Sequence, residues 1–271
     1  MPMNNRLMVP RNTFTPRSIA GLGAWFDATD LSTLSQTSDG ATPVAANNDP
    51  VAFWRCKVTG TALTQGIDAN RPLYKSAGLN SRQTLDFDGS NDILFSTTGS
   101  LMSVFKNVSG GTLIGVRSFT YVGAFRVAAI WSVNGGAGSR LNISHNTSAA
   151  AGILGGRRLD GDTVANVTYT NIDNTPGIIT GLANWGSAVA TVRLNGTQVG
   201  QSSPWLTAGS TSNTDSAFVA IGGAVTTLPS TTGSNYLGQF SELLAWPRVL
   251  TASEIARIER YLANKWGIAI A

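Results

Sequence analysis

The clearest hydrophobic pattern in the chain lies in residues 236–271, at its C-terminal end. Apolar and polar positions in residues 237–246 predict a strand, which Pro247 ends because proline has no N–H to donate to a ladder. Thr251 and Glu254 then form a capping box, the strongest helix-start signal in the sequence. Four apolar residues follow at helical spacing and share one face: Ile255, Ile258, Leu262 and Trp266.

The opposite face of this predicted helix is polar, with Arg257, Arg260 and Asn264. Lys265 falls in the last turn, where a cation complements the helix dipole, and Gly267 is placed to end the helix. No other segment has a helical pattern of comparable quality. A lone amphipathic helix at the end of a strand-rich chain is expected to pack on a sheet.

Most of the remaining sequence consists of short strand-like segments separated by polar turns. Residues 118–133 are the longest apolar stretch and predict one central strand. Asn195-Gly196 joins two alternating runs and predicts a two-residue hairpin, while Asp88-Gly89 predicts a second turn. Further strand-like segments lie at residues 19–34, 51–58, 84–95, 141–144, 152–159, 163–169, 177–182, 188–194 and 218–222.

Two regions are predicted along the chain. Residues 1–18 show no hydrophobic period and are expected to form an arm outside the folded body. Residues 19–271 show neither a tandem repeat nor a shift in composition, so we expect them to form one domain.

The composition supports a strand-rich fold. Hydrophobic residues make up 42% of the 271 residues and charged residues only 13%, against a usual charged fraction of about a quarter. Gly, Ser, Thr, Asn and Ala fill the difference, as suits a β-sandwich with many polar turns. The chain is too apolar to be disordered.

The formal net charge is +4, and its clearest local bias is in the predicted arm. Arg6, Arg11 and Arg17 all precede the first acidic residue, Asp27. Such an arm is suited to an acidic protein surface or to nucleic acid. We favour protein because no aromatic residue beyond Phe14 is interleaved for base stacking. The three arginines are therefore predicted to anchor the arm to a protein partner.

Cys56 is the only cysteine, so no disulfide can form within the chain. No apolar signal-peptide core is visible near the start, and no run reaches the roughly 18 apolar residues of a membrane helix. We expect a protein that is made in a cytoplasm and has no membrane partner.

The order of several short motifs resembles a known family. WFDATDLSTL is followed by RPLYKSAGLNSRQTLDFDGSNDIL, then by VRLNGTQVG, and finally by ASEIARIERYLANKWGI. This series resembles the laminin-G-like branch of the concanavalin A-like lectin/glucanase jelly rolls, as met in bacterial and bacteriophage proteins. The resemblance covers residues 19–271 and implies an all-β, two-sheet antiparallel jelly-roll sandwich closed by the C-terminal amphipathic helix. The NNRLMVPR of the arm is similar to short leaders on phage virion proteins.

The glucanase members of this family imply a test for enzymatic activity. They place a nucleophile and an acid/base carboxylate about 5–5.5 Å apart, commonly on a Glu-x-Asp-x-x-Glu strand. The only glutamates here are Glu242, Glu254 and Glu259, and none has that pattern. His145, the only histidine, lies in a polar NISHNTS segment and is expected to be an exposed turn residue without a catalytic role. We therefore expect no enzymatic activity and no catalytic residue.

Three groups of residues are candidate binding sites. Glycan-stacking candidates are Trp185 and Trp205, which lie beside turns, although packing under a loop is the alternative for both. Arg157 and Arg158 could hold an acidic sugar, or form a solvated pair. The densest oxygen cluster suggests either a calcium site or a turn closed by its own side chains: Asp86, Asp88, Asn91 and Asp92. Apart from calcium, we expect no cofactor.

The leading functional hypothesis is a non-enzymatic phage virion protein, made in the host cytoplasm. A lectin-like body would be anchored to other virion proteins through the arm, as a capsid decoration, head fibre or tail component, with cell-surface glycans as a second partner. A stand-alone carbohydrate-binding adhesin and a polysaccharide hydrolase are the alternatives. We expect no nucleic-acid partner, and a homo-oligomer, because sheet edges must be covered.

Overall fold

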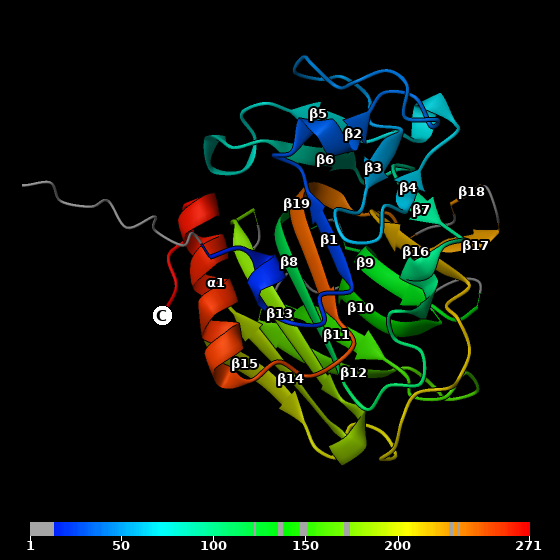
Figure 1. The fold of residues 1–271 in the computed structure, drawn as a ribbon, viewed down its shortest axis with the longest axis vertical. Helices are drawn as coiled ribbons and strands as arrows, with labels where there is room; N and C mark the ends of the chain where they lie inside the picture. The colour runs from blue at the N-terminus through cyan, green and yellow to red at the C-terminus, as the bar shows by residue number, and fades with distance from the viewer. Residues whose placement is uncertain are drawn as a thin grey trace, which may run out of the picture.

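A computed structural model describes residues 14–121, 123–134, 138–146, 151–170, 174–227, 230–231 and 234–271. Within these residues the chain forms two antiparallel β-sheets packed face to face, with an α-helix on the outside of one sheet (Figure 1). The predicted all-β sandwich with a C-terminal helix is confirmed. No helix in these ranges is long and apolar enough to cross a membrane.

The first sheet, sheet A, has eight strands in the order β15-β14-β13-β8-β19-β6-β5, with β1 paired to β19. Its long central strands are covered on both faces, and β8 is buried along almost its whole length. The strands are β1 (Ala24–Asp27), β5 (Leu73–Lys75), β6 (Thr84–Asp88), β8 (Gly111–Phe119), β13 (Gly177–Asn184), β14 (Val189–Leu194), β15 (Thr197–Ser202) and β19 (Leu237–Trp246).

The second sheet, sheet B, has nine strands in the order β12-β11-β10-β9-β16-β7-β4-β3-β2. They are β2 (Leu34–Ser35), β3 (Phe53–Arg55), β4 (Ala62–Thr64), β7 (Leu94–Ser96), β9 (Arg126–Ser132), β10 (Ser139–His145), β11 (Ala151–Gly156), β12 (Ala165–Thr170) and β16 (Phe218–Ile221). A small separate pair is formed by β17 (Val225–Thr227) and β18 (Ser230–Thr231). The short 3-10 helices are η1 (Pro16–Ser18), η2 (Leu31–Thr33), η3 (Asp68–Asn70), η4 (Leu79–Ser81), η5 (Ser100–Ser103) and η6 (Trp185–Ser187).

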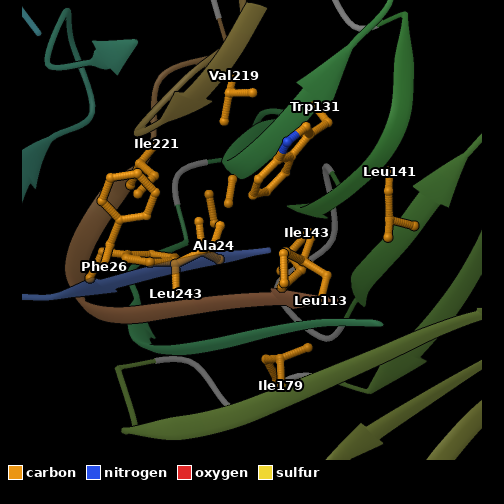
Figure 2. Close-up of a cluster of buried hydrophobic side chains, with 14 of the residues drawn as sticks. Ala24, Phe26, Leu113, Trp131, Leu141, Ile143, Ile179, Val219, Ile221 and Leu243 are labelled. Carbon is orange, nitrogen blue, oxygen red and sulfur yellow. The ribbon is translucent and has the colours of Figure 1, made fainter. Parts of the chain in front are cut away.

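The main hydrophobic core fills the space between the two sheets. Figure 2 shows Leu113 and Leu243 of sheet A on the side facing Trp131 and Ile143 of sheet B. All four side chains are fully buried. Because successive strand residues point to opposite faces, the alternate positions of the same sheet A strands point outward and need a second cover.

The helix α1 (Ala252–Trp266) provides that cover. Its four predicted apolar residues are all buried, and they pack in one cluster with Ile114, Ile178 and Leu244 on the outer face of sheet A. In Figure 1 the helix lies along the side of the sandwich, beside β13. A helix with only one apolar stripe is suited to a place on the outside of a sheet.

Local sequence signals placed the ends of several elements correctly. The Thr251 side chain accepts a hydrogen bond from the Glu254 amide, and Gly267 ends α1 at a φ of 63°. Asn195 and Gly196, at φ values of 48° and 85°, join β14 to β15. Two consecutive positive φ values define the hairpin turn that an Asn-Gly pair favours.

The prediction of one central strand over residues 118–133 is wrong. Residues up to Phe119 belong to β8 of sheet A, whereas β9 of sheet B begins at Arg126. The chain therefore crosses from one sheet to the other inside this apolar stretch. Both strands are buried, so apolar character continues across the crossing and hides it from a periodicity search.

Candidate functional site

A hollow of about 600 Å³ lies on the outer side of α1. We call it the α1 hollow. Its lining residues are Phe14, Arg257, Arg260, Tyr261, Asn264 and Lys265. The helical members recur at intervals of three and four residues and so share one face of α1. Phe14, from the segment preceding β1, supplies the remaining wall.

Aromatic rings and cations alternate in this lining. The Phe14 and Tyr261 rings meet edge to face, with centroids 5.8 Å apart. The Arg257 guanidinium carbon lies 4.8 Å from the Phe14 centroid. Arg257 and Arg260 are exposed, and neither forms an ion pair with a carboxylate in the described ranges. Both guanidiniums therefore remain available to a ligand.

Lys265 connects the hollow to a buried pair of acids beneath α1. Asp27 of β1 and Glu242 of β19 lie directly opposite each other in the strand register. The Lys265 ammonium is 2.7 Å from Asp27 Oδ1 and 2.8 Å from Glu242 Oε2. Like charges opposed across a strand pair repel each other, so the lysine supplies the compensating charge.

The carboxylate of Glu242 is fully buried and receives three donors. The Trp25 indole N–H donates to Oε1 at 2.8 Å, and the Trp266 indole N–H donates to Oε2 at 2.7 Å, beside the Lys265 contact. Burial raises the pKa of Glu242, and Lys265 opposes that rise. At Asp27 burial also acts to raise the pKa, but Lys265 and other partners outweigh it, so the pKa lies below its usual value.

The other two glutamates are also committed to structural contacts. Glu254 caps α1 and binds the Arg248 guanidinium at 2.7 and 2.8 Å, and these contacts lower its pKa to about 2. Glu259 is buried and accepts hydrogen bonds from Thr180 at 2.8 Å and from Arg193 at 3.0 Å. All three glutamates of the chain therefore hold α1 or its neighbours in place.

A second hollow, of about 520 Å³, lies near the end of η1. Its lining includes Arg17, Asp30, Arg55 and Lys57. The Lys57 ammonium is 2.8 Å from Asp30 and 3.2 Å from Asp27. Asp27 is thus bound by a lysine from each hollow, because Lys265 reaches it from the other side.

Of the three arginines predicted to anchor the arm, only Arg17 falls within the described residues; Arg6 and Arg11 lie outside them. The Arg17 guanidinium donates to the Lys57 carbonyl oxygen. Phe14 also contacts the body, against Tyr261. Residues 14–18 therefore lie against the domain.

The glycan-stacking prediction for Trp185 and Trp205 needs correction, because neither ring has an open face. Trp185 is fully buried and Trp205 is only 5% exposed. Their ring centroids are 6.2 Å apart, and the Trp205 indole donates to the Ala165 carbonyl at 3.2 Å. The segment after β15, to which Trp205 belongs, is bound to Trp185 by a hydrogen bond from the Gly209 amide to the Trp185 carbonyl oxygen. This is the packing alternative.

The neighbouring arginines brace a loop. Arg157 donates to the Asp160 carbonyl at 2.8 Å, and Arg158 donates to the Ser210 carbonyl at 3.3 Å. Arg140, which sequence reasoning missed, is 1% exposed and forms an ion pair with Asp160. No local signal marks Arg140, since its partner lies beyond the next strand.

The acidic cluster forms a turn. The Asp88 carboxylate accepts the amides of Ser90 and Asn91 at 2.8 and 3.2 Å, and the Asp92 carboxylate accepts the Asp88 amide at 2.9 Å. Asp86 instead pairs with Lys75 at 3.5 Å. In the described ranges no group of three or more His, Cys, Asp or Glu residues could hold a metal ion. The geometry is that of the turn alternative.

The expectation that His145 is exposed is wrong. It lies in β10 and is fully buried, with its ring stacked on Phe119 at a centroid distance of 3.6 Å and an angle of 5°. Burial holds the pKa of His145 well below its usual value, so the ring is neutral at pH 7. Cys56 is also buried.

Comparison with known proteins extends only to the fold. No protein-family model matches the sequence, and no curated protein sequence matches it. Among solved structures, Trypanosoma rangeli sialidase in complex with 2,3-difluorosialic acid is similar at a TM-score of 0.54 and 10% identity, over 96% of this chain and 37% of that one. The chain thus spans little more than a third of the sialidase.

Two smaller lectin-like structures are also similar. A pentraxin from Limulus polyphemus has a TM-score of 0.49 at 14% identity, over 65% of this chain and 81% of its own. The CBM40 of a Ruminococcus gnavus sialidase, bound to sialyllactose, has a TM-score of 0.47 at 12% identity, over 69% and 95%. At 10% identity the similarity to the sialidase shows the fold alone.

Replacing Lys265 with methionine should show how much the buried acid pair destabilises the fold when its cation is removed. We expect Lys265→Met to lower the free energy of unfolding by about 3 kcal/mol, because two buried carboxylates lose their shared cation. Urea unfolding followed by tryptophan fluorescence measures this. The control is Lys75→Met, which removes a partly exposed ion pair of 3.5 Å and should cost less than about 1 kcal/mol. Equal losses in the two variants would contradict the structural role of Lys265.

Asp92 should make stability depend on pH. Burial raises its pKa from the usual 3.8 to about 7, so between these values the folded state binds a proton that the unfolded chain releases. The stabilising contribution of this proton is present at low pH and is lost as the pH rises through 7. We therefore expect Asp92→Asn to gain stability relative to the natural protein from pH 5 to pH 8. Urea midpoints at both pH values test this, and a constant difference would refute the assignment.

Proposed function

We propose that this protein is a non-enzymatic, lectin-like module that binds carbohydrate in the α1 hollow. The lining of that hollow is the observation that carries the proposal. Tyr261 and Phe14 supply aromatic surface for the apolar face of a sugar ring. Arg257, Arg260 and Asn264 supply exposed polar groups that can orient its oxygens. A hollow of about 600 Å³ is within the usual size range of small-ligand sites.

The engagement of the glutamates supports the non-enzymatic part of the proposal. A glycosidase of this fold would need a pair of carboxylates that reach the sugar. Glu242 is fully buried beneath α1, and Glu259 is 2% exposed. Glu254 is occupied by Arg248 and by the helix cap. None of the three is placed to act as nucleophile or acid on a bound glycan.

We further propose that the module is displayed on a phage virion and held there through its N-terminal arm. The packing of Phe14 and Arg17 supports this, because it gives the preceding segment a defined point of departure beside α1.

Glycan binding should depend on Tyr261. We expect the full-length protein to bind members of a glycan array, and Tyr261→Ala to weaken that binding at least about tenfold because the sugar loses its stacking surface. Titration calorimetry with the bound glycan measures the loss. Tyr121→Ala, a tyrosine outside the lining, is the matched control and should bind normally. An array without any bound glycan, or equal binding by both variants, would refute the proposal.

The arm should be protected on the particle. Trypsin cleaves after arginine, so Arg6 and Arg11 report access to the arm. In purified virions that contain the protein, we expect cleavage at these sites to be at least about tenfold slower than in the isolated protein. Mass spectrometry of the released peptides follows both rates. Equal rates would show that no partner holds the arm.

A further inference from the structure

We infer that the α1 hollow selects glycans that carry acidic groups, a specificity that rests on the carbohydrate-binding function proposed above. The inference comes from the hydrogen-bonding character of the lining. Arg257 and Arg260 have only donors, while the ammonium of Lys265, the third cation of the lining, is already bound to Asp27 and Glu242. Among the described residues that line the hollow, Tyr261 and Asn264 provide the only side-chain acceptor oxygens, and none is a carboxylate.

A neutral sugar is poorly matched to such a lining. Each sugar hydroxyl both donates and accepts, so a site for neutral glycans must offer acceptors as well as donors. A carboxylate or sulfate only accepts, and it satisfies several N–H groups at once. The imbalance of the lining therefore favours a ligand with acceptors in excess.

The balance of charge around α1 points in the same direction. The two acids that share Lys265, Asp27 and Glu242, are buried, and Glu254 at the start of α1 binds Arg248. Glu259 faces the other way and binds Arg193. This leaves the guanidiniums of Arg257 and Arg260 as uncompensated charges on the exposed side of the helix.

The spacing of the two arginines suits a single acidic group or two neighbouring ones. Residues three apart on a helix have Cβ atoms about 5–6 Å apart. A guanidinium binds a carboxylate through two parallel N–H donors, which adds direction to the charge attraction. Arg257 rests on the Phe14 ring at 4.8 Å, which limits its freedom before the ligand arrives.

The second hollow, near Arg17, has a different character. There Asp30 stands beside Arg17, Arg55 and Lys57, and its carboxylate binds the Lys57 ammonium at 2.8 Å. Acceptor and donor are both present in that lining, and the charge is partly compensated. The excess of donors is thus a property of the α1 hollow in particular.

Matched pairs of charged and neutral glycans test the inference. Titration calorimetry of the full-length protein compares trigalacturonate with its neutral methyl ester, and dextran sulfate with dextran, beside an array that displays neutral and acidic glycans. We expect the bound members of the array to be acidic. Where the acidic member of a matched pair binds, its neutral counterpart should bind at least about tenfold more weakly. If the methyl ester binds more weakly than trigalacturonate, the recognised group is a carboxylate. If dextran binds more weakly than dextran sulfate, the recognised group is a sulfate.

Two glutamine variants test whether the preference for acidic glycans arises in the α1 hollow. Arg257→Gln and Arg260→Gln should each weaken acidic binding at least about fivefold, and added salt should weaken it further. Lys106→Gln removes the same charge outside the hollow and should leave binding unchanged. Neutral glycans bound as well as acidic ones, with Tyr261 still required, would overturn the inference and leave the proposed function intact. If no glycan binds at all, both fail.

Discussion

Two carboxylates directly opposite each other on adjacent buried strands are the constraint on which this structure depends. Asp27 and Glu242 occupy such positions in β1 and β19, where water cannot screen them. Their repulsion is offset by the Lys265 ammonium, which lies within 2.8 Å of both. Because that lysine belongs to α1, the helix is located by a charge requirement as well as by its apolar face.

The two sides of α1 consequently have separate roles. The buried side packs on Ile114 and Leu244 and completes the acid pair. The arginines on the exposed side are not bound to a buried carboxylate of the described residues, so they remain available to a ligand. Lys265 lies at the boundary between the two sides: it is one of the residues that line the hollow, and its ammonium is bound to the buried acids.

The sequence was sufficient to predict features that depend on neighbouring residues. The Thr251 and Glu254 cap and the Asn195-Gly196 turn are determined within a few positions, and both are confirmed. The buried environment of His145 depends on distant strands, and its polar neighbours in the sequence pointed to the wrong surroundings. For Trp185 the sequence left glycan stacking and packing under a loop open, and the fold shows the packing. Likewise, no local pattern could show that Asp27 would face Glu242, because the strand register joins opposite ends of the chain.

The pairing of β1 with β19 also determines when the protein can become folded during its synthesis. Strand β1 emerges from the ribosome long before β19, its hydrogen-bonding partner, is translated. Until then Trp25 lacks the Glu242 acceptor, and Asp27 lacks the Lys265 cation. Long-range pairings of this kind close slowly and leave strand edges exposed in the meantime. A nascent chain that stalls before Glu242 therefore has an unpaired β1 and is a natural substrate for chaperones or proteases.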